Sequence, residues 1–163
     1  MRSTHNGATL VELVITIVII SVAIAGVVGA FSLIAGRSAD PLNQARAVKL
    51  AQLYMDEILS QKYDDQTPQG GFPKYTGLCT IGAEGSEDRA TFDDVDDYDG
   101  LSGAPSTATG AALSGYSGFS ISIAVSCAGT EVGLPAAEAK RIDLDITAPG
   151  NQSFSFTAYR ANF

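Results

Sequence analysis

Histidine is nearly absent from this sequence: His5 is the only one among 163 residues. The chain beyond it therefore lacks the imidazole that serves in hydrolase triads, in most zinc sites and in most acid–base catalysis. The glycines near Gly77, Gly82 and Gly85 are not followed by the Lys-Ser or Lys-Thr pair of a phosphate-binding loop. We therefore expect a protein that is not an enzyme.

Positive charge is also scarce, since 10 Lys and Arg residues stand against 18 Asp and Glu residues, which gives a net charge of −8. Such a chain repels the phosphates of DNA and RNA, so we expect no nucleic-acid partner. Its length, less one long apolar stretch, leaves enough residues for one small globular head.

Charge is missing altogether from Leu13 to Ala35, an apolar stretch that begins directly after Glu12. About 20 apolar residues span the hydrocarbon core of a bilayer, so the stretch is either a membrane helix or a signal sequence. A charge at the centre of such a helix costs about 2.5 to 3.5 kcal/mol, and less near its end. Glu12 therefore either extends to the membrane surface or has a cationic partner.

The few residues before this stretch include Arg2, with His5 as a second basic group, whereas nearly all acidic residues follow it. Positive charge favours the cytoplasmic side of a membrane, and acidic residues count little in this rule. We expect a single-pass protein with a cytoplasmic N-terminus and the bulk of the chain outside.

Two cysteines, Cys79 and Cys127, lie in the part that this orientation places in an oxidising compartment. A disulfide between them is expected there. Closing a loop of this length stabilises a fold by about 4 kcal/mol in the chain-entropy model. The alternative is a pair of buried thiols.

After a short basic leader, the block around Glu12 reads Gly7-Ala8-Thr9-Leu10-Val11-Glu12-Leu13. With the apolar stretch behind it, this block resembles the start of type IV prepilins. The resemblance implies an α+β pilin fold, cleavage between Gly7 and Ala8 by a prepilin peptidase, and methylation of the new Ala8 amine. It also implies that Glu12 pairs with the N-terminal amine of a neighbouring subunit in a filament. The chain departs from most family members at Ala8, where they carry Phe.

A secretory signal is the alternative for the same stretch. Ala23-Ile24-Ala25 before Gly26 has the small residues of a signal peptidase site. This alternative leaves Glu12 without an explanation. The first residue of the mature protein distinguishes the two, since Ala8 supports the pilin and Gly26 supports the secretory signal.

A second helical pattern follows the apolar stretch. Asp40 and Pro41 are typical of a helix start, and apolar residues then recur at three- and four-residue spacing: Val48, Ala51, Met55, Ile58 and Leu59. We expect a leader over 1–7, a transmembrane and filament-core helix over 8–36, and an amphipathic helix over 37–62. The two helices form one rod bent near 36–41, or the rod breaks at Asp40.

The chain from 63 to 117 is rich in Gly, Pro, Asp, Ser and Thr, which predicts a variable loop region with little regular structure. Five aspartates lie in seven of its positions: Asp93, Asp94, Asp96, Asp97 and Asp99. Clustered carboxylates can bind calcium, although the EF-hand pattern fails because Tyr98 occupies a ligand position. We favour a solvated acidic turn without a cofactor, anchored by Phe92, Val95 and Tyr98.

Alternation of apolar and polar residues returns in the last part of the chain. It covers Phe119 to Cys127, Arg141 to Ile146 and Ser153 to Thr157, with a turn at 149–151 between the last two. Alternation of period two predicts half-buried strands, and short connections favour an antiparallel sheet over 118–163. The amphipathic helix covers the apolar face of this sheet, so that 37–163 form one head.

Several head segments resemble the D-type minor pilins of the mannose-sensitive haemagglutinin pilus, namely 51–59, 91–98, 139–142 and 158–163. This resemblance implies a minor pilin that helps to prime pilus assembly. Its partners are then other major and minor pilins, the prepilin peptidase and the inner-membrane assembly platform. The head lies in the periplasm first and on the pilus at the cell surface later. The alternatives are a pseudopilin of a type II secretion system and a membrane-tethered periplasmic binding domain.

Overall fold

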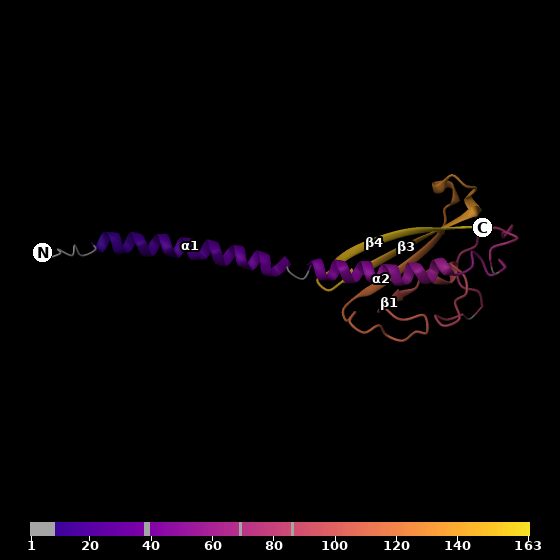
Figure 1. Ribbon diagram of the computed structural model, residues 1–163, viewed down its shortest axis with the longest axis horizontal. Coiled ribbons are helices and arrows are strands. Elements are labelled where there is room, and N and C mark those ends of the chain that lie inside the picture. The colour runs from indigo at the N-terminus through magenta and orange to yellow at the C-terminus, as the bar shows by residue number, and fades with distance from the viewer. Residues whose placement is uncertain (1–8, 38–39, 69, 86) are drawn as a thin grey trace. The chain divides into compact units, whose positions relative to one another are not determined.

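The computed structural model describes residues 9–37, 40–68, 70–85 and 87–163, and Figure 1 shows it as a ribbon. The chain divides into two units, Met1–Leu42 and Asn43–Phe163, and each is described by itself. Helix α1 (Leu10–Arg37) belongs to the first unit, and helix α2 (Asp40–Ser60) provides most of its length to the second. Whether the two helices form one bent rod or break depends on residues 38 and 39, which lie outside the described residues.

Helix α1 begins after Thr9, whose side chain and carbonyl satisfy amides of the first turn. Thr9 Oγ1 accepts a hydrogen bond from the Glu12 amide at 3.3 Å, and the Thr9 carbonyl accepts one from the Leu13 amide at 3.1 Å. A threonine in this place is a good N-cap because it pairs amides that a helix start otherwise leaves unpaired. Further along α1, three hydroxyls donate to the carbonyl four residues earlier and so need no water: Thr16, Ser21 and Ser32.

A four-stranded antiparallel sheet forms the centre of the second unit. Its order is β1 (Ser102–Gly103), β2 (Ser120–Cys127), β3 (Ala139–Ala148) and β4 (Gln152–Ala161). The register places apolar side chains in rows across the sheet, such as Ile123 opposite Leu144 and Leu144 opposite Phe156. The strands expected from the alternation of period two are confirmed.

The turn between β3 and β4 requires an unusual backbone. Gly150 and Asn151 both have positive φ, at 84° and 59°. Glycine and asparagine adopt this left-handed region at the lowest cost, which explains why this sequence reverses the chain here. The predicted turn at 149–151 is confirmed.

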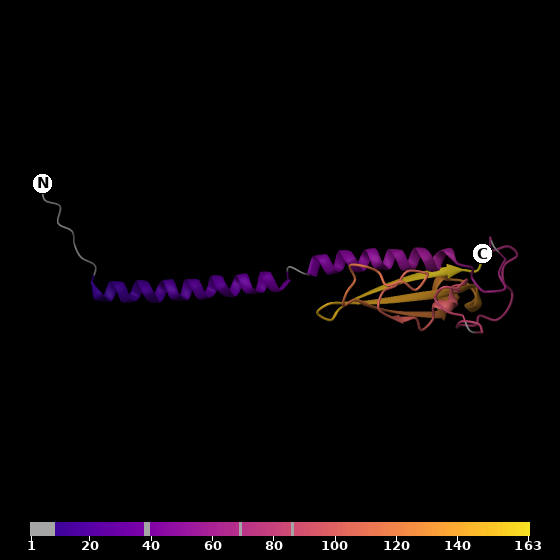
Figure 2. The same ribbon diagram turned by 90° about the horizontal axis from the view of Figure 1, so that it is seen from below.

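Helix α2 lies along one face of the sheet, as the two views show (Figure 1, Figure 2). Its fully buried residues recur at three- and four-residue spacing and join the inward rows of β2 and β3 in one core: Ala47, Leu50, Tyr54 and Ile58. The amphipathic helix is confirmed, but the prediction put Val48 on the buried face, and Val48 is 39% exposed. Tyr54 takes part in the core instead. Its burial is tolerated because its hydroxyl forms hydrogen bonds with the backbone of Ser106.

The predicted loop region contains short elements that the sequence did not indicate. A turn of 3-10 helix, η1 (Asp96–Tyr98), precedes β1, and β1 pairs with β2. Two isolated bridges join Lys62 to Asp94 and Ser106 to Ala112. Two further turns, η2 (Gly129–Val132) and η3 (Ala136–Glu138), connect β2 to β3. The loops are therefore held to the sheet and to the end of α2 by backbone pairing.

Candidate functional site

The N-terminal block is described from Thr9 onward. Gly7 and Ala8, the predicted processing residues, lie outside the described residues. Glu12 sits in the first turn of α1 and is exposed. A carboxylate near a helix N-terminus interacts favourably with the helix dipole by about 0.3 to 1 kcal/mol. This interaction offsets part of the free-energy cost of a charge at the start of an apolar helix. Because Glu12 is exposed, its carboxylate remains accessible to a group outside the chain.

The described surface of α1 beyond Glu12 is predominantly apolar. Each large apolar side chain that the structure describes between Leu10 and Ile34 is at least 50% exposed. The segment Leu10–Ser32 is long and apolar enough to cross a membrane, with a mean hydropathy of 2.8 over its most apolar window. A surface of this kind needs lipid or other apolar helices around it. The helix therefore supports anchoring of the chain in a membrane.

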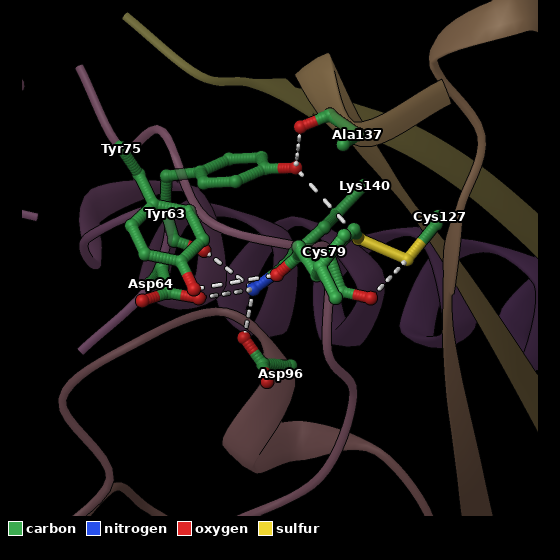
Figure 3. Close-up of a disulfide and its surroundings, with 9 residues drawn as sticks. Tyr63, Asp64, Tyr75, Cys79, Asp96, Cys127, Ala137 and Lys140 are labelled. Carbon is green, nitrogen blue, oxygen red and sulfur yellow. Dashed lines mark hydrogen bonds and ion pairs between the residues drawn. A yellow bond between two sulfur atoms is a disulfide. The ribbon is translucent and has the colours of Figure 1, made fainter. Parts of the chain in front are cut away.

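Cys79 and Cys127 form the predicted disulfide, which Figure 3 shows with its surroundings. It joins the loop after α2 to the end of β2, with 6.1 Å between the two Cα atoms. The hydroxyl of Tyr63 lies beside it and donates to the Ala137 carbonyl at 2.9 Å. Burial, followed by the charge of Asp64, raises the pKa of Tyr63 to about 12, so the hydroxyl remains a donor at neutral pH.

A buried lysine lies next to this disulfide, and sequence reasoning missed it. Lys140 on β3 has no exposed surface. Its ammonium group donates to the Tyr63 carbonyl at 2.7 Å, contacts the carboxylate of Asp96, and lies 3.8 Å from that of Asp64 (Figure 3). The nitrogen also lies 4.7 Å from the centre of the Tyr63 ring. A charge with no water around it is tolerated only with such a set of partners.

The acidic segment is a buried turn, which corrects the expectation of a solvated one. Asp94, Asp96 and Asp97 are at most 2% exposed. Asp97 Oδ2 accepts the amides of Asp93 and Asp94 at 2.9 and 3.1 Å, and Asp94 Oδ1 accepts those of Asp96 and Asp97 at 2.9 and 3.3 Å. These amide bonds, together with Lys140, replace part of the water that the carboxylates lose on burial.

The predicted apolar anchors of this segment are confirmed. Val95 and Tyr98 are at most 1% exposed, and Phe92 packs edge-on against the Tyr98 ring with 5.2 Å between ring centres. The hydroxyl of Tyr98 donates to Glu57 Oε1 on α2 at 2.8 Å. The turn is thereby fixed to the helix as well as to the sheet.

The five aspartates proposed as calcium candidates do not act as one set. Asp93 pairs with Lys62 at 2.6 Å, and Asp99 Oδ1 accepts the Val125 amide of β2 at 2.8 Å. Both therefore have structural partners of their own.

The other three aspartates meet two glutamates that the sequence did not single out. The carboxylates of Glu84, Glu87 and Asp97 form one group, and those of Glu84, Asp94 and Asp96 form another, each with its oxygen atoms within 4.8 Å of one another. Because Glu84 and Glu87 lie outside helices and strands, no local pattern connects them with the aspartates.

Comparison with known proteins bears on the N-terminal block. Residues 2–28 match a family model described as the prokaryotic N-terminal methylation motif. A comparison with curated proteins gave no match, and one with solved structures gave none. The matched motif is that of pilin-like proteins, which are structural and are processed by prepilin peptidase. The motif, the apolar helix α1 and a head of one helix and a four-stranded antiparallel sheet together support a type IV pilin-like subunit with the α+β fold of pilins.

Proposed function

We propose that this chain is a minor pilin that helps to prime a type IV pilus of the mannose-sensitive haemagglutinin type. In this proposal prepilin peptidase cuts between Gly7 and Ala8, the Ala8 amine is methylated, and Leu10 to Ala35 moves from the inner membrane into the filament core. The observation that carries the proposal is Glu12, an exposed carboxylate at the start of a helix with an apolar surface.

Glu12 would align the subunit through its charge. Two opposite unit charges 4 Å apart attract by about 1 kcal/mol in water and by about 4 kcal/mol at an effective dielectric constant of 20. Packing of apolar helices removes water from around the pair, so the attraction between Glu12 and the N-terminal amine of a neighbouring subunit grows as the filament forms. In a subunit shifted along the fibre, the carboxylate would be buried without this amine. Burial of an unpaired charge costs on the order of several kcal/mol and so disfavours the shifted position.

The head would present its surface to other pilins. Before assembly it lies in the periplasm with the N-terminus in the cytoplasm, and after assembly it lies on the pilus at the cell surface. Its partners are major and minor pilins and the inner-membrane assembly platform. The head segments that resemble minor pilins and the disulfide that suits an oxidising compartment both support this location.

Replacement of Glu12 tests the proposal. Glu12→Gln keeps the size of the side chain and its polar end but removes the charge. We expect about a tenfold or larger drop in the amount of this chain in sheared surface fibres, because a buried charge pair with one partner removed loses 3 kcal/mol or more. Quantitative mass spectrometry of fibres and membranes measures this, and the level in membranes should stay unchanged.

Thr9→Val is the matched control. It removes the hydroxyl that caps α1 but leaves the carboxylate in place. Incorporation close to that of the unaltered chain is expected. Equal losses for both variants would show that Glu12 acts only by starting the helix. Normal incorporation of Glu12→Gln would contradict the role given to Glu12, absence of the unaltered chain from fibres would favour a membrane-tethered binding domain, and loss of protein secretion with normal pili would assign the chain to a type II secretion system.

A further inference from the structure

Two overlapping groups of carboxylates share Glu84 and form what we call the acidic cluster: Glu84, Glu87 and Asp97 in one, and Glu84, Asp94 and Asp96 in the other. The three aspartates have at most 2% of their surface exposed, Glu87 is half-buried and Glu84 is exposed. The cluster is therefore closed on the aspartate side and open on the side of the glutamates. An ion could enter from solvent there and reach the buried oxygen atoms.

Each buried aspartate uses one oxygen atom and leaves the other without a partner. The used atoms are Asp94 Oδ1 and Asp97 Oδ2, which accept backbone amides, and Asp96 Oδ1, which contacts Lys140. Among the residues that the structure describes, the opposite atoms are buried without a hydrogen bond: Asp94 Oδ2, Asp96 Oδ2, Asp97 Oδ1 and also Glu87 Oε2. Buried acceptors nearly always have a partner, so this set requires an explanation.

Charge in the cluster is also unbalanced. Within the described part of the chain, Lys140 is the cation in contact with these carboxylates, and it is shared with Asp64. No ion pair of the described residues includes Asp94, Asp97, Glu84 or Glu87.

We propose that the acidic cluster binds one calcium ion at the group of Glu84, Glu87 and Asp97, through the unpartnered oxygen atoms of Asp97 and Glu87 and the carboxylate of Glu84 at the open side. A set of oxygen atoms alone suits a hard cation and not zinc or copper, which prefer nitrogen and sulfur. Calcium accepts six to eight oxygen ligands in irregular arrangements, whereas magnesium needs a near-ideal octahedron and keeps its waters. This inference is independent of the proposed role in a pilus.

Such an ion would hold separate parts of the head together. The cluster contains Glu84 and Glu87 together with the turn at 94–97, and Lys140 links that turn to β3. Binding to the folded state alone raises the stability of the fold according to the ratio of free calcium to Kd. Calcium would therefore order the loop region of the head.

The test uses the full chain in detergent, freed of metal by a chelator and titrated with calcium chloride in a calorimeter. One calcium per chain is expected. The thermal midpoint of the head, followed by tyrosine fluorescence because the chain has no tryptophan, should rise by roughly 10 °C at a hundredfold excess of calcium over Kd. Magnesium chloride should give a clearly smaller rise. The absence of both heat and a shift in the midpoint would overturn the proposal.

Two variants and a control connect binding to the cluster. Glu84→Gln changes an exposed side chain, so the fold should persist while Kd rises about tenfold or more. Asp97→Asn can still accept the two amides but has lost the free carboxylate oxygen, and it should show no calcium response. Asp56→Asn removes an exposed charge on α2 outside the cluster and should bind as the unaltered chain does. Equal weakening by Asp56→Asn would mean that binding follows net charge, which contradicts the site.

Discussion

Lys140 depends more than most other residues on partners that lie far from it in the chain. Its ammonium group contacts Asp96, 44 residues earlier, and Tyr63, 77 residues earlier. The strand pattern alone predicts that its side chain points inward, because it shares the even-numbered face of β3 with Ile142 and Leu144. The sequence therefore contains the signal for burial. The local sequence does not identify the partners that make burial tolerable, because these residues come together only in the folded head.

At this scale we predict that Lys140→Met destabilises the head by about 3 to 5 kcal/mol, because Asp96 then remains buried without its cation. Urea unfolding of the full chain in detergent, followed by tyrosine fluorescence, measures the change. Addition of Asp96→Asn to Lys140→Met should recover part of the loss, since it removes the unpaired charge.

Lys49→Met is the control for the removal of a lysine. Lys49 is exposed on α2, so its replacement should change the stability by less than about 0.5 kcal/mol. Equal stabilities of Lys140→Met and Lys49→Met would contradict the role given to the buried ammonium group.

At the scale of elements, the loops after α2 are fixed by contacts that no local pattern reveals. The strands of the sheet and the amphipathic face of α2 could be predicted because alternation and helical spacing repeat within a few residues. The turn η1 and strand β1 lie in a segment rich in Gly, Pro and Asp, whose order comes from pairing with distant strands. The prediction of a solvated acidic segment is wrong for the same reason.

The disulfide is one such contact. Replacement of both Cys79 and Cys127 by Ser should lower the stability of the head by about 2 to 4 kcal/mol, because the bond closes a loop across 48 residues. Urea unfolding with and without a reductant measures this. The reductant should lower the midpoint of the unaltered chain and leave that of the double variant unchanged. Identical midpoints for all four conditions would contradict a stabilising bond.

The hydroxyl of Tyr54 is a second contact between a helix and a loop. It donates to the Ser106 carbonyl at 3.0 Å and accepts the Ser106 amide at 2.9 Å, and Tyr54 is fully buried. Tyr54→Phe should therefore destabilise the head by about 1 to 3 kcal/mol, the cost of buried groups left without partners.

Tyr159→Phe is the matched control for the loss of a phenolic hydroxyl. Tyr159 is 39% exposed and donates to Glu131 at 2.7 Å, so water can replace its bond. Its loss should cost less than about 1 kcal/mol in the same unfolding experiment. A larger cost for Tyr159→Phe than for Tyr54→Phe would show that the loop is not held by Ser106.

At the scale of the whole molecule, the two units are stabilised by different interactions. The first contains a helix with a described surface that is apolar and exposed, so its stability requires lipid or other helices. The second has its own core between α2 and the sheet and its own disulfide. The sequence predicted this division, because a long uncharged stretch and alternating strands are both local patterns. The acidic cluster could not be predicted, because its members come from separate loops.

The N-terminal residue of the mature chain tests the central claim most directly. Mass spectrometry of the N-terminal peptide, taken from sheared surface fibres, determines it together with any methyl group on its amine. The account predicts that the chain begins at Ala8 with a methylated amine. A chain that begins at Gly26, or at Met1, would contradict processing at Gly7 and with it the pairing role proposed for Glu12.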